Sequence, residues 1–490
     1  MNDIKFVDTT IRDGQASLWA MNMRTQHMLS AMPYLDAAGF ESMEFIATGS
    51  RLKKFVRHLG ENPWDWIKGG AAAAKRTPLR WHGSIGGRTM SGYVPKSVGE
   101  LLISKAVELG IELTRTGNNW NDYEALRPQL DKLSQLGMSS VVNIIYSVSP
   151  RHTDEYFIQK AKEAAQLSPY RLCFKDVGGL LTPDRIRALL PRMLEVTPNS
   201  VWEFHGHCNN SFGPINALEC AKLGIKVIHT AIPPLSDANS QPSVFNVADN
   251  LRALGFNPII DEVALKPASE YFEFIARKEK FQIGVPYRYD EKLYQHQVPG
   301  GMISNLQYQL ALAGVENKIQ QVLEEIPAVR ADLGYPIMVT PLSQIVGTQA
   351  AVNVIVGERY AQVTDQTIEY ALGRHGRSAP ELMNQEVRDK ILSRPRAEEL
   401  KNLEPWEPSL DQLRQRYGHS TSDEDLILMS IVGDDSLDIV GSSTNNSFYL
   451  EKPRALTELI RHLAKDDKHR FISVSKGEFS LKMVKEISKN

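Results

Sequence analysis

Cysteine is scarce in this sequence. Its 490 residues include three cysteines, Cys173, Cys208 and Cys220, and no two of them stand in a CxxC spacing. A disulfide framework needs several paired cysteines, and a thiolate zinc site needs closely spaced ones, so the sequence argues against both. The low cysteine count is typical of a protein that works in a reducing compartment.

The sequence also lacks long hydrophobic runs and an excess of charge of one sign. No stretch of 18 apolar residues occurs, and the opening MNDIKFVD has no basic segment followed by an apolar core. We therefore expect no membrane span and a cytoplasmic location. The formal net charge is −2 and the isoelectric point is about 6.7. The sequence therefore has no excess of basic residues of the kind that binds nucleic acid. Small molecules and other proteins are the expected partners.

Glycine-rich phosphate-binding motifs are missing as well. The residues after the first apolar run read TTIRDGQAS, which is not a GxGxxG motif, and no GxxxxGK loop is visible. These absences argue against an open dinucleotide-binding sheet and against a phosphate loop for ATP.

Eight short apolar runs recur through the first half of the chain, with amphipathic helical patterns between them. Strand patterns that alternate with helix patterns indicate parallel βα units. Eight such units fit the length of a closed (β/α)8 TIM barrel, which we assign to residues 1–270. The runs lie at residues 4–10, 40–47, 79–86, 111–117, 140–147, 170–177, 200–207 and 226–232.

The pattern changes after about residue 270, where helical segments such as 268–281 follow one another without strands between them. This change predicts a helical second domain over residues 271–420. Near the end of the chain, residues 470–486 alternate on both sides of Lys-Gly-Glu and predict a hairpin, with a helix before it at 454–466. We expect a small C-terminal α/β extension at 421–490.

Charged and imidazole side chains stand at the carboxyl ends of several predicted strands. Asp13 follows the first run, Lys175 closes the sixth, and His205 and His207 close the seventh. Barrels of this class build their active sites at this end. Side chains alternate along a strand, so both imidazoles of HGH should point to the same side. Two imidazoles and a carboxylate on one rim can bind a divalent cation, although HGH alone is more often an ordinary polar pair.

Lys175 lies inside the apolar run LCFKDV. A buried lysine must be paired, held in its neutral form or modified. Pairing with Asp176 is the simplest explanation, but a neutral amine can also take up carbon dioxide as a carbamate, which turns a cation into an oxygen ligand. The residues alone leave these alternatives open.

A set of further motifs, spread over much of the chain, accompanies these residues. They are DTTIRD (8–13), MRT (23–25), ENPW (61–64), GY (92–93), ND (121–122), YSVSPRHTDEYF (146–157), FKDVGGLLTP (174–183), HGHCNNSFG (205–213), SQPS (240–243), HQVPGGMISNL (296–306) and VTPLSQIVGTQAAVNV (339–354). With them the chain resembles the carboxyltransferase component of biotin-dependent 2-oxo acid enzymes. This family includes a domain of pyruvate carboxylase, the alpha chain of oxaloacetate decarboxylase and the 5S subunit of transcarboxylase.

The resemblance implies a site at the barrel mouth, covered by the helical domain as a funnel. Arg12 would bind the carboxylate or enolate of the substrate, and Thr340 would carry a proton between biotin N1 and the acceptor carbon. Arg12 and Asp13 would then have separate tasks instead of pairing with each other. The metal would be zinc, cobalt or manganese, and its implied ligands are Asp13, a carbamylated Lys175, His205 and His207.

The resemblance also implies partner chains. A separate biotin carboxyl carrier protein would bring biotin, and a separate biotin carboxylase subunit would load it, while a homodimer would form through the barrels. The enzyme would transfer a carboxyl group to or from a small acceptor such as pyruvate, as a ligase or as a lyase. Lys482 beside Met483 is reminiscent of a biotinyl hairpin, but Leu481 precedes the lysine, so an ordinary surface lysine is expected.

Several substrate-side positions depart from the family pattern DTTxRDAHQSL and its neighbours. Gln15 and Ala16 stand where the family has His and a substrate-contacting Gln, so Gln15 either takes over that contact or the contact is missing. Gly86 stands in place of a second substrate arginine, which Arg88 could replace only by a two-residue shift, and Asn118 stands in place of Asp. We therefore expect an acceptor other than plain pyruvate, or a weakened pyruvate site.

Two other functions stay open at this point. Aldol or Claisen-type condensing lyases share the barrel, an RDGxQ opening and HxH ligands, but normally lack the lysine of FKDVGGLLTP and the VTPLSQIVGTQA segment. A degenerate scaffold subunit would keep the fold without the metal, and metal analysis would distinguish it from an enzyme.

Overall fold

The computed structural model divides the chain into two compact units, Met1–Ser443 and Thr444–Asn490. Within the described residues no helix combines the length and the apolar character needed to cross a membrane. The structure describes residues 2–442 except 48–49, 90–91, 300–302, 304–305, 308–309 and 312–313, together with 463, 471–476 and 479–484.

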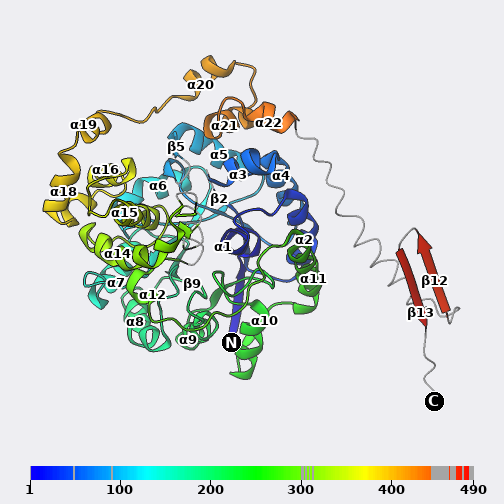
Figure 1. Cartoon of the computed structure of the whole chain (residues 1–490). Helices are drawn as coiled ribbons and strands as arrows, with labels where there is room; N and C mark the ends of the chain where they lie inside the picture. The colour runs from blue at the N-terminus through cyan, green and yellow to red at the C-terminus, as the bar shows by residue number, and fades with distance from the viewer. Residues whose placement is uncertain are drawn as a thin grey trace. The chain divides into compact units, whose positions relative to one another are not determined.

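Eight parallel strands of the first unit form a closed barrel (Figure 1). Neighbours in the order β10, β9, β8, β7, β6, β3, β2, β1 are hydrogen-bonded, and a further pairing of β1 with β10 closes the ring. Each strand overlaps one of the eight predicted apolar runs, so the predicted (β/α)8 barrel is confirmed. The strands are β1 Asp3–Asp8, β2 Ser42–Ala47, β3 Leu79–His82, β6 Leu113–Thr116, β7 Ser139–Ile145, β8 Arg171–Asp176, β9 Trp202–Gly206 and β10 Val227–Thr230.

Three short strands of this unit were not predicted. β11, Asn257–Ile259, pairs with the first residues of β1, and β4, Gly87–Thr89, forms an antiparallel ribbon with β5, Gly92–Val94. Each of them has three residues, which is too short for a recognisable alternating pattern.

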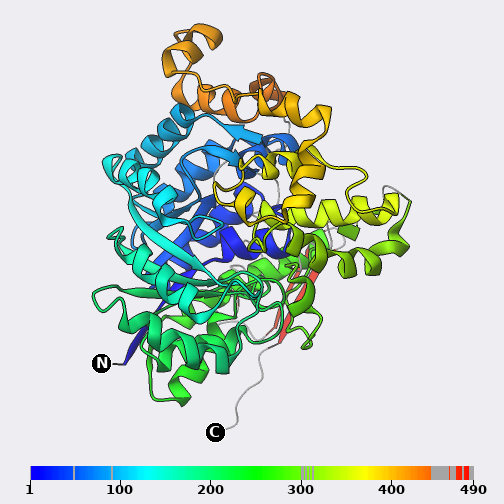
Figure 2. The same cartoon turned by 90° about the vertical axis from the view of Figure 1, so that its left-hand side faces the viewer.

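The helices between the strands surround the barrel (Figures 1 and 2). Several begin at a side chain that accepts a backbone N–H, such as Asp122, Thr153, Thr182 and Asp261. The helical elements are η1 Thr10–Gly14, α1 Gln15–Leu18, α2 Thr25–Ala37, α3 Ser50–Lys54, η2 Phe55–Leu59, α4 Pro63–Ala73, α5 Lys96–Glu108, α6 Tyr123–Gln135, α7 Asp154–Ala165, α8 Pro183–Glu195, α9 Gly213–Lys222, α10 Val244–Ala253 and α11 Glu262–Glu279.

A second, mainly helical part follows the barrel and has an apolar cluster of its own, to which the barrel contributes Trp120. Its helix α21 packs against α5, and Leu426 belongs to the main apolar cluster of the barrel. The predicted helical region is therefore present, while its boundaries at 270 and 420 stay predictions. Its elements are α12 Leu293–His296, η3 Glu316–Lys318, α14 Ile319–Asp332, α15 Leu342–Val356, α16 Asp365–Ala371, α17 Ala379–Leu382, α18 Gln385–Leu392, α19 Pro395–Lys401, α20 Leu410–Tyr417, α21 Asp423–Ile431 and α22 Ser436–Ser442.

The described part of the second unit is a hairpin, as predicted. β12, Phe471–Lys476, pairs antiparallel with β13, Phe479–Val484, and Ser473 lies opposite Lys482. The helix predicted at 454–466 lies outside the described residues except for Leu463.

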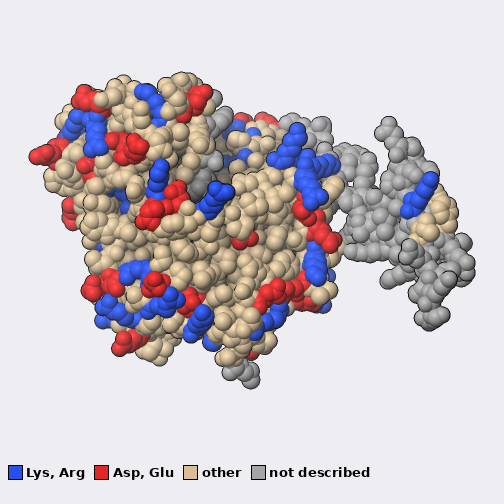
Figure 3. Space-filling model, turned by 60° about the horizontal axis from the view of Figure 1, so that its bottom comes forward, with Lys and Arg blue, Asp and Glu red and all other residues tan. Residues whose placement is uncertain are grey.

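Charged side chains of both signs are interspersed on the face of the molecule shown in Figure 3. This mixture agrees with a formal net charge of −2. The face therefore presents mixed charge to a partner instead of a field of one sign.

Candidate active site

Asp13 is presented by a tight turn directly after β1. The backbone N–H groups of Asp13 and Gly14 both donate to the carbonyl of Thr9, at 2.8 and 2.9 Å. A Cβ atom on Gly14 would lie 2.9 Å from the carbonyl oxygen of Leu235, so this close approach needs glycine. The family's alanine at this position would therefore not fit this turn without a shift of the loop.

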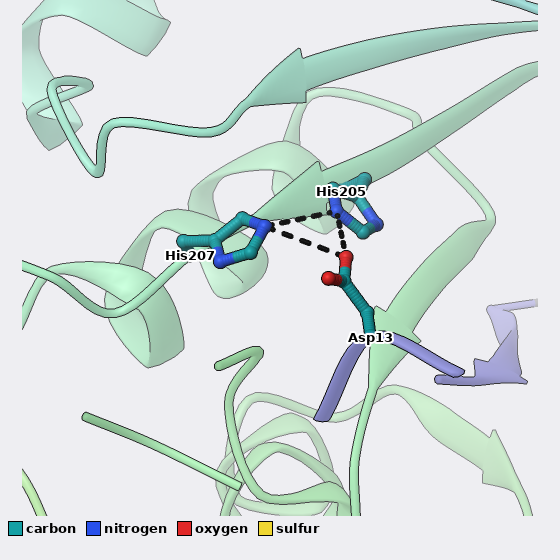
Figure 4. A group of neighbouring side chains, drawn as sticks. All are labelled: Asp13, His205 and His207. Carbon is teal, nitrogen blue, oxygen red and sulfur yellow. Dashed lines mark hydrogen bonds and ion pairs between the residues drawn. The ribbon is translucent and has the colours of Figure 1, made fainter. Parts of the chain in front are cut away.

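The two histidines of HGH meet the carboxylate of Asp13 (Figure 4). The Nε2 atoms of His205 and His207 lie 3.1 and 3.5 Å from Asp13 Oδ2, and 3.3 Å from each other. The prediction that both imidazoles point to the same side is confirmed. All three side chains are buried, at 7% exposure for Asp13, 0% for His205 and 8% for His207.

Hydrogen bonds on the far side of each ring determine which nitrogen carries the proton. His207 Nδ1 lies 2.6 Å from the carbonyl oxygen of Asn239, so it must donate there. His205 Nδ1 lies 3.0 Å from His229 Nδ1, and His229 Nε2 lies 3.0 Å from the carboxylate of Glu203. Since Glu203 can only accept, His229 donates to it and accepts from His205. In the neutral rings, Nε2 of His205 and of His207 therefore carries a lone pair and no hydrogen.

The charges around the cluster support these protonation states. Burial, then Arg115, lowers the pKa of His205 well below its usual value, and burial also lowers that of His229. Burial opposes the ionisation of Asp13, but Arg12 and His207 outweigh it and hold the pKa of the carboxyl well below its usual range. An anionic carboxylate of Asp13 and neutral imidazoles of His205 and His229 are therefore expected at neutral pH.

A divalent cation fits this arrangement. Two lone pairs and a carboxylate oxygen converge with separations of 3.1 to 3.5 Å. Ligand atoms bound to one metal at about 2.0–2.2 Å lie roughly 3 to 3.5 Å apart. Three acceptors this close repel one another unless a cation or a hydrogen-bond donor lies between them.

Lys175 lies on β8, where it is paired in register with His205 of β9. The residue is 8% exposed, and among the described residues its amine has neither a hydrogen bond nor an ion pair. Burial and the nearby Arg115 lower the pKa of Lys175 to about 7 despite the attraction of Asp13. Asp176 accepts instead from the backbone N–H groups of Leu180 and Leu181, so the pairing with Asp176 considered from the sequence is not formed.

Arg12 and Asp13 are paired with each other, which corrects the expectation that these two charges would not pair; their separate roles in binding stay predictions. Arg12 Nη2 lies 2.8 Å from Asp13 Oδ2, and its Nε lies 2.7 Å from Glu44 Oε2. Glu44 also pairs with Arg115, and these two arginines hold the pKa of Glu44 well below its usual value although burial raises it. The guanidinium of Arg12 is thus fixed at the barrel mouth between two carboxylates, with 11% of its side chain exposed.

Gln15 is fully buried, and both ends of its amide are engaged by the backbone. Its Nε2 donates to the carbonyl of Ile11 at 2.6 Å, and its Oε1 accepts from the N–H of Met23 at 3.1 Å. Its role in substrate binding stays a prediction and would require the amide to leave both partners.

The other positions at which the sequence departs from the family's substrate-binding pattern have structural roles. A Cβ on Gly86 would lie 3.0 Å from the carbonyl oxygen of Val94, so this position has little room for a side chain. Arg88 pairs with Glu369 of the helical part at 2.7 Å. Asn118 accepts from the N–H of Trp120 at 2.8 Å and thereby shapes the loop after β6.

Thr340 lies in the segment between α14 and α15 and is exposed. Its carbonyl accepts from the side chain of Asn119 at 3.2 Å, and Asn119 belongs to the loop at the carboxyl end of β6. A cavity of about 440 Å³ opens here between the barrel loops and the helical part. Its lining includes Arg88, Tyr93, Asn119, Pro341, Arg374 and His375.

Comparison with known proteins places these features in a family. Residues 293–446 match the conserved carboxylase domain. A pyruvate carboxylase subunit of Methanocaldococcus jannaschii is 34% identical over 392 residues, which cover 79% of this chain and 68% of that protein. The large subunit of 2-oxoglutarate carboxylase of Hydrogenobacter thermophilus is 30% identical over 87% of this chain and 67% of that protein.

The chain belongs to the carboxyltransferase family of biotin-dependent carboxylases. A solved carboxyl transferase domain, from Rhizobium etli pyruvate carboxylase, superimposes with a TM-score of 0.79 at 22% identity, over 90% of this chain and 77% of that domain. This likeness shows the shared barrel fold. Membership of the family favours a carboxyltransferase over the condensing lyase that the sequence had left open.

Several buried polar residues of this carboxyltransferase site were not predicted. Three of them lie fully buried in the barrel around the predicted residues: Glu44, Arg115 and His229. A fourth, Glu203, forms a salt bridge with Arg80 at 2.7 Å. The signal that could have identified them is a charged or imidazole residue inside an apolar strand, as in SMEFIA, LTRT and VIHT. Gln241 lies in the motif SQPS (240–243), from which the sequence alone predicts no role for it.

Proposed function

We propose that this carboxyltransferase moves a carboxyl group between carboxybiotin, delivered on a separate carrier protein, and a small 2-oxo acid bound at the barrel mouth. The observation that supports the proposal most is the convergence of Asp13, His205 and His207 beside the buried amine of Lys175. The test is a reconstituted assay with a biotin carrier and a biotin carboxylase, together with metal analysis of the purified chain. A metal-free protein without transfer activity would support the scaffold alternative.

The proposed metal ligands are Asp13, His205, His207 and a carbamylated Lys175. Imidazole and oxygen ligands suit zinc, cobalt or manganese. A divalent cation bound there supplies the Lewis acidity that favours the enolate form of a 2-oxo acid. Arg115, which pairs with Glu44, and Arg12 add positive charge next to that position.

Arg12 and Thr340 have the proposed roles closest to the substrate. The guanidinium of Arg12 binds the acceptor carboxylate, for which its planar pair of donors is suited. Biotin, when bound as carboxybiotin, would supply carbon dioxide and would need a proton at N1. The hydroxyl of Thr340 takes a proton from the acceptor carbon and passes its own to N1, and the resulting enolate carbon attacks the carbon dioxide. Exclusion of water from this site when carboxybiotin and the acceptor are bound would prevent loss of carbon dioxide.

Carbamylation of Lys175 can be tested directly. We expect the purified chain, kept in bicarbonate, to carry one labile carbon dioxide on this amine, because a buried lysine with no partner among the described residues gains oxygen ligands for a cation in this way. The amine nitrogen bonds to carbon dioxide and one N–H proton leaves. Labelled bicarbonate and NMR should show one protected carbamate signal that is absent in Lys175→Gln. An unmodified lysine in the metal-loaded protein would contradict this assignment.

The acceptor is proposed to differ from plain pyruvate or to bind pyruvate weakly. Gln15 is engaged by backbone groups, and Gly86 leaves little room for a second arginine. The relatives described above include both a pyruvate carboxylase and a 2-oxoglutarate carboxylase. In transfer assays with pyruvate, 2-oxoglutarate, other 2-oxo acids, acyl-CoAs and amides, we expect a higher kcat/KM for an acceptor other than pyruvate. Efficient turnover of pyruvate above all others would contradict this expectation.

Biotin is proposed to arrive on another chain. Lys482 is exposed on β13 and lies opposite Ser473 in a hairpin, with Leu481 before it. We expect no band when the purified chain is blotted with streptavidin after expression with a biotin ligase. A strong band that disappears in Lys482→Arg would show that the chain carries its own biotin.

The quaternary structure is part of the same proposal. We propose a homodimer that associates through the barrels and binds a biotin carboxyl carrier protein and a biotin carboxylase subunit. Sedimentation of the purified chain, alone and mixed with both partners, tests these associations.

A further inference from the structure

Gln241 reaches into the centre of the candidate metal site. The residue is fully buried in the loop between β10 and α10. Its amide nitrogen Nε2 lies 3.2 Å from Asp13 Oδ2, 3.3 Å from His205 Nε2 and 3.0 Å from His207 Nε2. Gln241 therefore contacts the three atoms that converge on the proposed cation.

In the metal-free protein the hydrogens around this amide match the acceptors around it. Two N–H hydrogens of Gln241 face three acceptors. At the other end, the hydroxyl of Thr9 has one hydrogen for two acceptors, the Oε1 of Gln241 at 2.7 Å and the carbonyl of Thr230 at 2.9 Å. Asp13 Oδ2 also accepts from Arg12 Nη2 at 2.8 Å, and the carbonyl of Thr230 also accepts from the backbone N–H of Thr9 at 2.9 Å, so each acceptor at both ends has a hydrogen.

A cation between Asp13, His205 and His207 would meet the NH₂ group of Gln241, and a half-turn of the amide would present Oε1 in place of that group. Gln241 Nε2 then donates to the hydroxyl of Thr9, and Thr9 donates to the carbonyl of Thr230. The half-turn points Oε1 at the carboxylate of Asp13 and at two imidazole lone pairs. That orientation is unfavourable by itself and becomes favourable when a cation lies between the four acceptor atoms.

On this basis, which rests on the proposed metal centre, we infer that the side-chain amide of Gln241 turns over when a metal ion binds. Its NH₂ group faces Asp13, His205 and His207 in the metal-free protein, and its carbonyl oxygen is a ligand when a divalent cation is bound. Zinc, cobalt and manganese all accept such an oxygen. A neutral ligand holds the cation without lowering its net positive charge, which preserves its ability to polarise a substrate carbonyl.

Thr9 connects this residue to the rest of the site. Its carbonyl accepts from Asp13 and Gly14, and its hydroxyl contacts the amide of Gln241. One residue therefore positions the carboxylate ligand and the amide of Gln241 together. Thr9→Val, which keeps the shape but removes the hydroxyl, should weaken metal binding in the same direction as a change of Gln241.

The test compares four variants of the full chain, Gln241→Met, Gln241→Glu, Thr9→Val and Gln349→Met, by chelator competition for zinc, with thermal melts of the metal-free proteins. Gln241→Met keeps the length without a polar group and should weaken zinc binding about 10- to 100-fold. Gln241→Glu should bind zinc at least as tightly as the wild type, but its metal-free form should melt at a lower temperature, because a second carboxylate then faces Asp13. The control is Gln349→Met, since Gln349 is also fully buried and bonds instead to Asn353 and Gln362. Its zinc affinity should equal that of the wild type.

The outcomes separate this inference from the proposed function. Unchanged zinc affinity in Gln241→Met would overturn the inference and leave the metal centre intact. A loss in Gln241→Glu as large as that in Gln241→Met would show that the residue acts only through its N–H groups, and would also overturn it. A wild-type chain that binds no zinc, cobalt or manganese would overturn the metal centre itself. If Gln241→Met does not fold, the Gln241→Glu and Thr9→Val results decide.

Discussion

Thr340→Ala should lower the rate of carboxyl transfer by about 10²- to 10⁴-fold, the range expected when a group that carries a proton in the transition state is removed. The side chain is exposed, and the hydrogen bond that fixes this segment to Asn119 uses the carbonyl of Thr340. The variant should therefore keep its thermal stability and its metal content. The measurement is transfer to the acceptor in the reconstituted system, and biotin-dependent decarboxylation in the reverse direction.

Thr340→Ser is the matched control, because it returns the hydroxyl group without the methyl group. It should recover most of the rate. If Thr340→Ala keeps more than about a third of the wild-type rate, the proton passes by another route, since a general acid–base contribution is typically far larger.

Asp13→Asn should remove the bound metal and with it the carboxyl transfer. The substitution keeps the size of the side chain but replaces a charged ligand with a neutral one, and it can turn an N–H toward the two imidazoles. We expect the metal affinity to fall by at least about 100-fold, since even partners behind the ligands contribute 10- to 100-fold. Metal content after dialysis and chelator competition measure the effect.

Asp36→Asn is the control for burying an amide in place of a carboxylate. Asp36 and Asp13 are both 7% exposed, but Asp36 accepts from the backbone N–H groups of Lys75, Arg76 and Thr77. Its replacement should lower the melting temperature and leave metal affinity unchanged. Full metal content in Asp13→Asn would show that the two histidines bind the cation without this carboxylate.

The features of this structure that could be predicted from the sequence are those that follow from local sequence patterns. The apolar runs located all eight barrel strands because each strand is buried and bounded by helical patterns. The spacing of His205 and His207 predicted a shared direction because alternation along a strand is a backbone property. The place of Lys175 inside an apolar run indicated a buried side chain, and the residue is 8% exposed in the structure.

Contacts between distant segments could not be predicted in the same way. The pairing of Arg12 with Glu44 joins the turn η1 to the different strand β2. The approach of Gln241 to Asp13 joins residues 228 positions apart in the chain. Such contacts follow from closure of the barrel, and no local pattern encodes which side chains the closed ring brings together.

The pairing of β1 has a consequence for synthesis of the chain. This strand is made first, yet two of its three neighbours are β10 and β11, so its hydrogen bonds are incomplete until Ile259 has left the ribosome. Asp13 follows β1 and His205 lies on β9, so the chain must be made almost to the end of the barrel before the two residues can meet. A cation at the proposed site would thus join the two ends of the barrel sequence, and because it binds only the folded ring it would stabilise the closed barrel.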